Sequence, residues 1–314
     1  MARVVTFGEI MLRLAPVGYE RFFQSDRMEA TFGGGEANVA VSLANFGVDT
    51  TEIVRGGDRV GVYYLEKGAS QRGSVCIYDR AHSAIQESDP AEFDWDRILD
   101  GADWFHFTGI TPALGGNLVL ACRDACEAAR RKGITVSCDL NYRGKLWSRE
   151  QARRAMTMLC EYVDVCIANE EDARDVFGIS AKNTDITAGK LDWNGYRSVA
   201  EQLTAQFGFR AVAITLRGSI SASDNDWAGM LYTGGESYFS RNYRVHIVDR
   251  VGGGDSFGAG LIYALREKMP PQEAIDFAVA ASALKHSIEG DFNRASVAEI
   301  RKLAAGDGSG RVQR

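Results

Sequence analysis

Between residues 104 and 215, apolar runs alternate regularly with helical segments, and this pattern restricts the fold more than any other feature of the chain. The apolar runs predict strands at residues 104–107, 134–139, 163–167 and 211–215. The segments between and around them predict helices at 117–132, 149–161, 170–177 and 195–207. Such alternation favours an α/β fold, in which a parallel sheet carries helices on both faces. Ligands of these sheets bind at the carboxyl ends of the strands.

The N-terminal part follows a different rhythm. Residues 3–7 predict a first strand, closed by Gly8-Glu9, and 10–14 predict a second, edge-like strand before a polar, loop-rich stretch at 15–31. β-forming residues interrupted by charges at 53–54, 62–65 and 75–78 predict strands of a small, half-exposed sheet. We therefore expect one α/β domain over residues 1–314, with segments of about 10–31 and 53–80 forming an inserted small sheet, and a disordered tail at 306–314.

Composition excludes several classes of function. The chain is 45% hydrophobic with a net charge of -6, so it can bury a large core, and its acidic balance argues against nucleic acid as a partner. We find no apolar run long enough to cross a membrane, and residues 1–14 do not form a signal peptide, so we expect a cytoplasmic protein. The cysteines form no CxxC motif, which favours buried free thiols over disulfides or zinc. They are Cys76, Cys122, Cys126, Cys138, Cys160 and Cys166.

A glycine-rich turn at Gly252-Gly253-Gly254-Asp255 follows an extended apolar run at 243–248. Apolar residues then recur at helical spacing, so the glycines lie at the start of a helix, where unpaired backbone N–H groups attract an anion. Glycine lets a phosphate approach the backbone closely. A carboxylate beside such a site suits a general base that deprotonates an attacking hydroxyl. The residues alone equally allow Asp255 to be a helix cap.

A second glycine-rich turn, Gly33 to Asn38, precedes a predicted helix at 39–44. Its open backbone suits a polyhydroxy ligand, and Asn38 can donate and accept hydrogen bonds; a tight packing turn is the alternative. The chain contains no GxxxxGK[ST], GxSxG or HExxH motif, and the later glycine turn does not fit GxGxxG.

Together, the two turns resemble the signatures of the ribokinase-like sugar kinases, the later one closely over residues 249–260. Within that family the chain is most similar to the 2-keto-3-deoxygluconate kinases. The residues that carry this similarity are 63–68, 78–80, 139–143, Leu146-Trp147 and 287–293. The resemblance extends over nearly the whole chain and implies a ribokinase-like fold whose small sheet is a lid over the sugar.

The resemblance implies transfer of the ATP γ-phosphate to the terminal hydroxyl of 2-keto-3-deoxygluconate. Asp255 would be the general base, and Gly252, Gly253 and Gly254 would form the anion hole. Substrate would be bound by Gly34, Gly35, Asn38, Tyr63, Tyr78, Arg80, Arg143 and Asp291. Physical chemistry supports the arginines, since a guanidinium binds a carboxylate through paired hydrogen bonds; surface or ion-paired arginines are the alternative.

For the nucleotide, the resemblance implies binding by Asn141, Asn169, Thr215, Arg217, Gly218, Ser219, Gly252 and Gly254. The run 169–172 resembles a magnesium-associated Asn-x-x-Glu motif, here ending in Asp172, so Asn169 and Asp172 would act on Mg²⁺ through water. A capped acidic helix start would give the same run. The cofactors implied are ATP, Mg²⁺ and a monovalent cation. We also expect a homo-oligomer, a dimer or larger, formed through the exposed apolar face of the lid.

One departure from the family follows the helix at 39–46. Gly47 runs directly into Val48-Asp49-Thr50, where the family has a further strand and short helix. A deletion would expose a core face and a sheet edge, so we favour an omitted stretch. Two alternative functions stay open: a fructokinase or other sugar kinase of the same family, and a non-catalytic sugar-binding protein.

Overall fold

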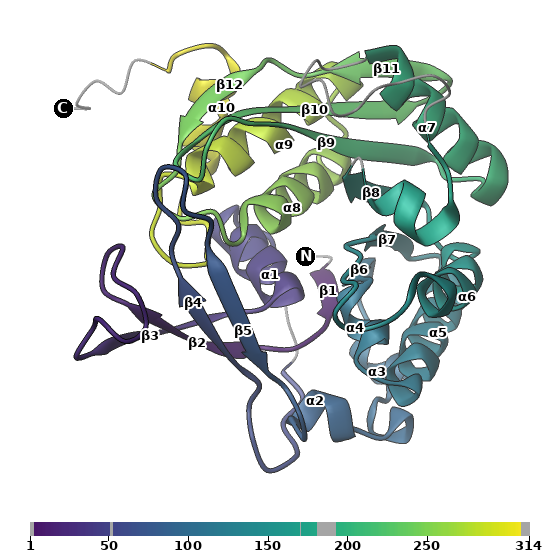
Figure 1. Ribbon diagram of the computed structural model, residues 1–314. Helices are drawn as coiled ribbons and strands as arrows, with labels where there is room; N and C mark the ends of the chain where they lie inside the picture. Colours follow the sequence, from purple (N-terminus) through teal and green to yellow (C-terminus); the bar gives the residue numbers. More distant parts are fainter. Residues whose placement is uncertain (1–2, 51–52, 170, 181–192, 309–314) are drawn as a thin grey trace.

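The computed structural model describes residues 3–50, 53–169, 171–180 and 193–308 (Figure 1). It has a large central sheet between two layers of helices, and a small second sheet that projects from one side. The predicted α/β fold is confirmed.

The large sheet has the strand order β1-β6-β7-β8-β9-β10-β11, with β12 paired to β10. Its strands are β1 (Arg3–Phe7), β6 (Ala102–Thr108), β7 (Thr135–Asp139), β8 (Val165–Asn169), β9 (Ala211–Ser219), β10 (Asp224–Thr233), β11 (Glu236–Phe239) and β12 (Tyr243–His246). The first five pair in parallel, and β10 is antiparallel to all three of its neighbours. The sequence predicted the parallel part; it did not predict β10 and β11.

Neighbouring residues of one strand point to opposite faces of this sheet, and each face has its own core. Val4 and Trp104 belong to one core, and Val5 and Phe105 to the other. The first core is covered by α1 (Gly35–Asn45), α8 (Gly253–Arg266), α9 (Pro271–Lys285) and α10 (Val297–Ala304). The second is covered by α3 (Trp95–Ile98), α5 (Gly116–Arg131), α6 (Arg149–Cys160) and α7 (Trp193–Phe207). Shorter helical turns are α2 (Ala84–Glu87), η1 (Pro90–Glu92), α4 (Ile110–Ala113) and η2 (Ala173–Phe177).

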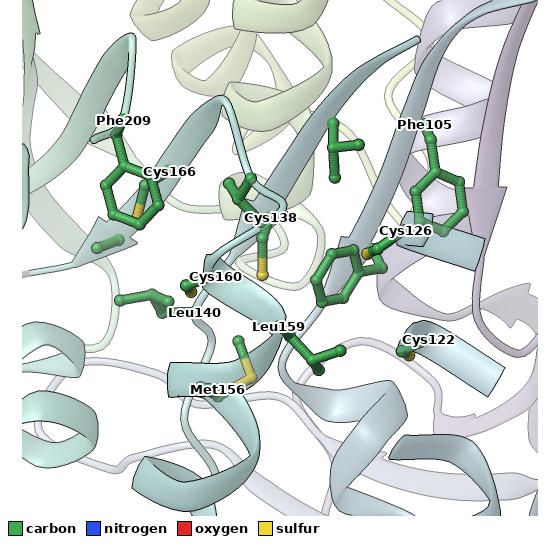
Figure 2. Close-up of a cluster of buried hydrophobic side chains, with 14 of the residues drawn as sticks. Phe105, Cys122, Cys126, Cys138, Leu140, Met156, Leu159, Cys160, Cys166 and Phe209 are labelled. Atoms are coloured by element: carbon green, nitrogen blue, oxygen red, sulfur yellow. The ribbon is translucent and has the colours of Figure 1, made fainter. Parts of the chain in front are cut away.

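Five of the six cysteines lie inside the second core, as the prediction of buried thiols requires; Cys76 lies on β5 (Val75–Asp79) of the small sheet and is only partly buried. Figure 2 shows Cys138 near the centre of this cluster, with Cys126 toward Phe105 and Cys160 toward Leu140. All six cysteines are free thiols, and all except Cys76 are buried. Burial raises the pKa of these five thiols, so they act as small apolar side chains.

The small sheet has the order β3-β2-β4-β5, which confirms the predicted second sheet. We call this sheet the lid below, and its function as a lid stays a prediction. Its strands are β2 (Met11–Pro16), β3 (Met28–Gly33), β4 (Val62–Glu66) and β5 (Val75–Asp79). Its inner face packs Met11, Tyr63 and Leu65 against Val251, next to the later glycine turn. The lid therefore lies directly over that turn.

Several predicted elements are wrong. Strand β3 begins inside the predicted loop 15–31, and residues 53–54 form no strand. The predicted helix 170–177 is only the π-type turn η2 over its described residues; Glu170 lies outside them. The side chain of Asn169 accepts from the N–H groups of Glu171 and Asp172, which is the hydrogen bonding of a helix N-cap.

After α1 the chain turns sharply at Gly47, where φ is +82°. The N–H of Val4 then donates to the Asp49 carbonyl, and Thr50 forms a single parallel bridge to Val4. The chain after α1 thus contacts the outer edge of β1 at Val4. The omitted stretch stays a prediction.

The N–H groups of Gly306 and Asp307 donate to carbonyls of α10, so the predicted disorder does not apply there; residues 309–314 lie outside the described ranges. Among the helices that the structure describes, none is long and apolar enough to span a bilayer.

Candidate active site

A cavity of about 420 Å³ lies between the lid, the two glycine turns and the carboxyl ends of β7, β8 and β9. The sheet topology predicted this location. Every predicted substrate residue lines the cavity: Gly34, Gly35, Asn38, Tyr63, Tyr78, Arg80, Arg143 and Asp291.

The later glycine turn starts α8, with Gly252 as its N-terminal cap. Gly252 has φ of +83°, and a Cβ there would lie 2.1 Å from the Asp291 carbonyl oxygen. A Cβ on Gly253 would lie 2.6 Å from the His286 ring, whereas Gly254 faces open space. The first two positions therefore require glycine, and the third leaves the backbone accessible to an anion.

Asp255 lies in the first turn of α8 and lines the cavity. Its side chain caps nothing, so the alternative of a helix cap is wrong. Burial raises its pKa to about 6, and a 2.7 Å hydrogen bond from the Asn38 amide opposes that rise. At neutral pH the carboxylate is therefore ionised, and its pKa is close to that of an efficient general base.

Asn38 brings the two glycine turns together. It is buried, its Nδ2 donates to Asp255, and its Oδ1 has no partner within the described residues. Gly34 has φ of +122°, and a Cβ there would lie 2.1 Å from the Glu9 carbonyl oxygen. The early turn is therefore tight, and it leaves a buried acceptor at the cavity wall.

Sequence reasoning missed Glu36, which is buried in the first turn of α1. Its Oε1 accepts from the Thr108 N–H (3.1 Å), the Thr108 hydroxyl (2.7 Å) and the Thr111 hydroxyl (2.9 Å). Burial raises its pKa to about 7, and the Asp255 charge adds to the rise. The sequence feature that could have indicated this role is an acidic residue between Gly35 and Ala37, inside a glycine-rich turn.

A second missed feature is a buried ion network beneath the cavity. Arg13 of β2 pairs with Asp249 at 2.5 Å and with Asp291 at 2.7 Å. The Tyr63 hydroxyl donates to the other oxygen of Asp291 at 2.5 Å. Both carboxylate oxygens of Asp291 are thus occupied by lid residues, so this residue anchors the lid as well as lining the cavity.

The two predicted substrate arginines differ. Arg80 stacks over the Tyr78 ring, 4.2 Å from its centroid, and its Nε donates to Glu9 at 2.5 Å. Arg143 is exposed and bonds to the Tyr142 carbonyl, and no described carboxylate pairs with it. Arg143 is therefore a positive charge at the cavity that has no carboxylate partner among the described residues.

Most predicted nucleotide residues line the same cavity: Asn141, Asn169, Thr215, Arg217, Gly252 and Gly254. Asn141 adopts a left-handed φ of +37°, which Asn tolerates better than most residues. The predicted strand 211–215 is too short, because β9 continues to Ser219, so residues 216–219 form no nucleotide-binding loop. Gly218 and Ser219 pair with Asp226 and Asn225 of β10 and do not line the cavity.

The family model of the pfkB family carbohydrate kinases matches residues 47–293. The chain belongs to this carbohydrate kinase family. The 2-dehydro-3-deoxygalactonokinase of Haloferax volcanii is 32% identical, with 98% of each chain covered. That alignment runs over 335 positions, more than the 314 residues here, so the relative has residues where this chain has none.

Solved structures give the same result. A crystal structure of 2-dehydro-3-deoxygluconokinase from Thermotoga maritima is 49% identical, with a TM-score of 0.93 over 97% of this chain and 98% of that one. A pfkB family carbohydrate kinase from Listeria grayi is 34% identical, with a TM-score of 0.88 over 96% and 99%. The ribokinase-like fold and kinase activity are thereby shown.

A pfkB kinase uses ATP, and the acidic groups on the nucleotide side fit a hydrated magnesium ion. Asp172 accepts from the N–H groups of Asn169 (3.2 Å) and Tyr142 (3.0 Å), and burial raises its pKa to about 6. Burial raises the pKa of Asp139 as well, and the negative charges of Asp172 and Asp255 raise it further. Oxygen donors that repel one another suit Mg²⁺. Asp139 was missed as a site residue, although it directly ends β7.

Proposed function

We propose that this chain phosphorylates 2-keto-3-deoxygluconate on its terminal hydroxyl with ATP. One observation carries the proposal: Asp255, beside the glycine turn, shares a cavity with the unpaired Arg143. The first group suits a hydroxyl that attacks phosphorus, and the second suits the carboxylate of a sugar acid.

The chemistry follows from these positions. Asp255 takes the proton of the terminal hydroxyl, whose oxygen forms a bond to the γ-phosphorus while the bond to the ADP oxygen breaks. The N–H groups at Gly252–Gly254 stabilise the charge on the transferring phosphoryl. The free Oδ1 of Asn38 accepts from a sugar hydroxyl, and its Nδ2 holds Asp255 in place.

At the other end of the sugar, Arg143 binds the carboxylate. Arg80 and Tyr78 form the wall beside it, and Glu9 balances the charge of Arg80. Gly34, Gly35, Tyr63 and Asp291 shape the remaining surface. The lid excludes water from this site, which limits wasteful hydrolysis of ATP.

On the nucleotide side, Asn141, Thr215 and Arg217 bind ATP, while Gly218 and Ser219 support it from β9. Asn169, Asp172 and Asp139 would hold Mg²⁺ through water, and the bound ion would supply charge neutralisation at the phosphates. A monovalent cation remains part of the proposal. If a monovalent cation is required, replacement of K⁺ by tetramethylammonium should lower the kinase activity. Unchanged activity would exclude this requirement.

We further propose a cytoplasmic homo-oligomer. The six free thiols favour a reducing compartment. The lid exposes Phe32, Val75 and Ile77, each about half accessible, which suits pairing of two lids. Light scattering of wild type and of Ile77→Lys tests this, since the charge should dissociate a lid-mediated dimer; a monomeric wild type would contradict it.

The decisive experiment is a coupled ADP-release assay with Mg-ATP. It compares 2-keto-3-deoxygluconate, its galactonate epimer, fructose, ribose and gluconate, for wild type and Asp255→Asn. We expect preference for a keto-deoxy acid and a loss of about 10²–10⁴-fold in the variant. Preference for fructose would favour the fructokinase alternative. Binding of sugar and ATP without turnover would favour the non-catalytic one.

A further inference from the structure

Arg250 lies in the cavity although no part of the glycine motif requires a cation there. It is half-buried, two residues before Gly252, and lines the cavity on the nucleotide side. Its Nη2 donates to the Ala222 carbonyl at 3.2 Å, which leaves the rest of the guanidinium available. A partly buried arginine beside an anion hole needs a negative partner.

Arg250 shares the cavity with another cation. Arg217 of β9 lines the same cavity, and after burial its charge is the second cause that lowers the pKa of Arg250. Across the described part of the chain, no carboxylate forms an ion pair with either arginine. Arg244, on the surface, does have such a partner, Asp226 at 2.6 Å. Two repelling guanidinium groups in one cavity are balanced by a polyvalent anion.

The Ala222 turn, to which Arg250 donates, links Arg250 to the lid. The turn that contains Ala222 joins β9 to β10, and the N–H of Ala222 donates to Ser70 in the lid. Arg250 thus connects the nucleotide-side turn to the glycine turn. An anion held there would extend from β9 toward Gly254.

We propose that Arg250, together with Arg217, binds the polyphosphate of ATP. This inference rests on the proposed kinase function and adds a residue to it. Arg250 is a phosphate-binding residue that acts on the nucleotide and has no role in sugar recognition. The competing explanation is a purely structural role, in which Arg250 only holds the Ala222 turn.

Binding measurements without sugar separate these explanations. The dissociation constants of ATP and of adenosine are measured by calorimetry for wild type, Arg250→Gln, Arg250→Lys and the control Arg244→Gln. We expect Arg250→Gln to weaken ATP binding about 10- to 100-fold and adenosine binding less than about twofold. Arg250→Lys should recover part of the ATP affinity because it keeps the charge. Arg244→Gln should behave as wild type.

Three outcomes would overturn the inference: unchanged ATP binding in Arg250→Gln, equal losses for ATP and adenosine, or equal losses in the Gln and Lys variants. Thermal melts show whether Arg250→Gln is folded. If it is not, Arg250→Lys is tested instead, and a larger loss of affinity for ATP than for adenosine supports the inference. Failure of the proposed function looks different, since wild type would then bind ATP normally and turn over none of the sugars.

Discussion

The side-chain amide of Asn38 donates a 2.7 Å hydrogen bond to Asp255, across 217 residues of sequence. This contact joins the two glycine turns and stabilises the ionised form of the base. It also holds the carboxylate next to Gly252–Gly254, and it opposes the rise in the pKa of Asp255 that burial causes.

The first prediction concerns pH. Because the pKa of Asp255 is about 6, kcat/KM should fall as pH drops below about 6, where the base becomes protonated. Asn38→Ala removes the bond that lowers this pKa, so the acid limb should move to higher pH. A pH–rate profile of both proteins measures this. A limb that stays in place or moves to lower pH would contradict the assigned role of Asn38.

The second prediction concerns the sugar acid. Arg143→Gln should lower kcat/KM for 2-keto-3-deoxygluconate by about 10- to 100-fold, since a charge-assisted hydrogen bond is lost. The KM for ATP should stay within about twofold. Arg154→Gln, on the exposed surface of α6, is the matched control. A larger effect on ATP than on the sugar acid would place Arg143 on the nucleotide side.

The third prediction concerns the lid anchor. Arg13→Met leaves Asp249 and Asp291 buried without their cation, which should lower the free energy of unfolding by about 3–5 kcal/mol. Tyr63→Phe removes one hydrogen bond from Asp291 and should cost about 1–3 kcal/mol. Urea denaturation measures both, with the exposed pair variant Arg244→Gln as control at about 0–1 kcal/mol. Equal stability of Arg13→Met and the control would refute the anchor.

The fourth prediction concerns Glu36. Its folded pKa, about 7, lies above its ordinary value of 4.5, so its protonated form is favoured in the folded state. That contribution is fully present below pH 4.5 and is lost as pH rises through 7. Glu36→Gln keeps the Oε1 acceptor and does not titrate. Its stability relative to wild type should therefore rise by more than about 1 kcal/mol from pH 4.5 to 8. A pH-independent difference between the two proteins would disprove the shift.

Sequence reasoning located the glycine turns, Asp255 and the lid because each depends on local pattern. It missed the antiparallel strand β10, which pairs with Gly218 and Ser219 of β9. It also missed Glu9, Glu36 and Arg13. Their partners are distant in sequence, so the local pattern carries no sign of the contact.

The sequence by itself determined where backbone must be glycine, which segments form strands and helices, and which charged residues were available. Only the tertiary structure decided which arginines are already paired. Arg80 meets Glu9 across 71 residues and Arg13 meets Asp291 across 278, whereas Arg143, Arg217 and Arg250 face the cavity. Ion pairing depends on distance in space and on burial, and both are set only when the small sheet packs against the later glycine turn.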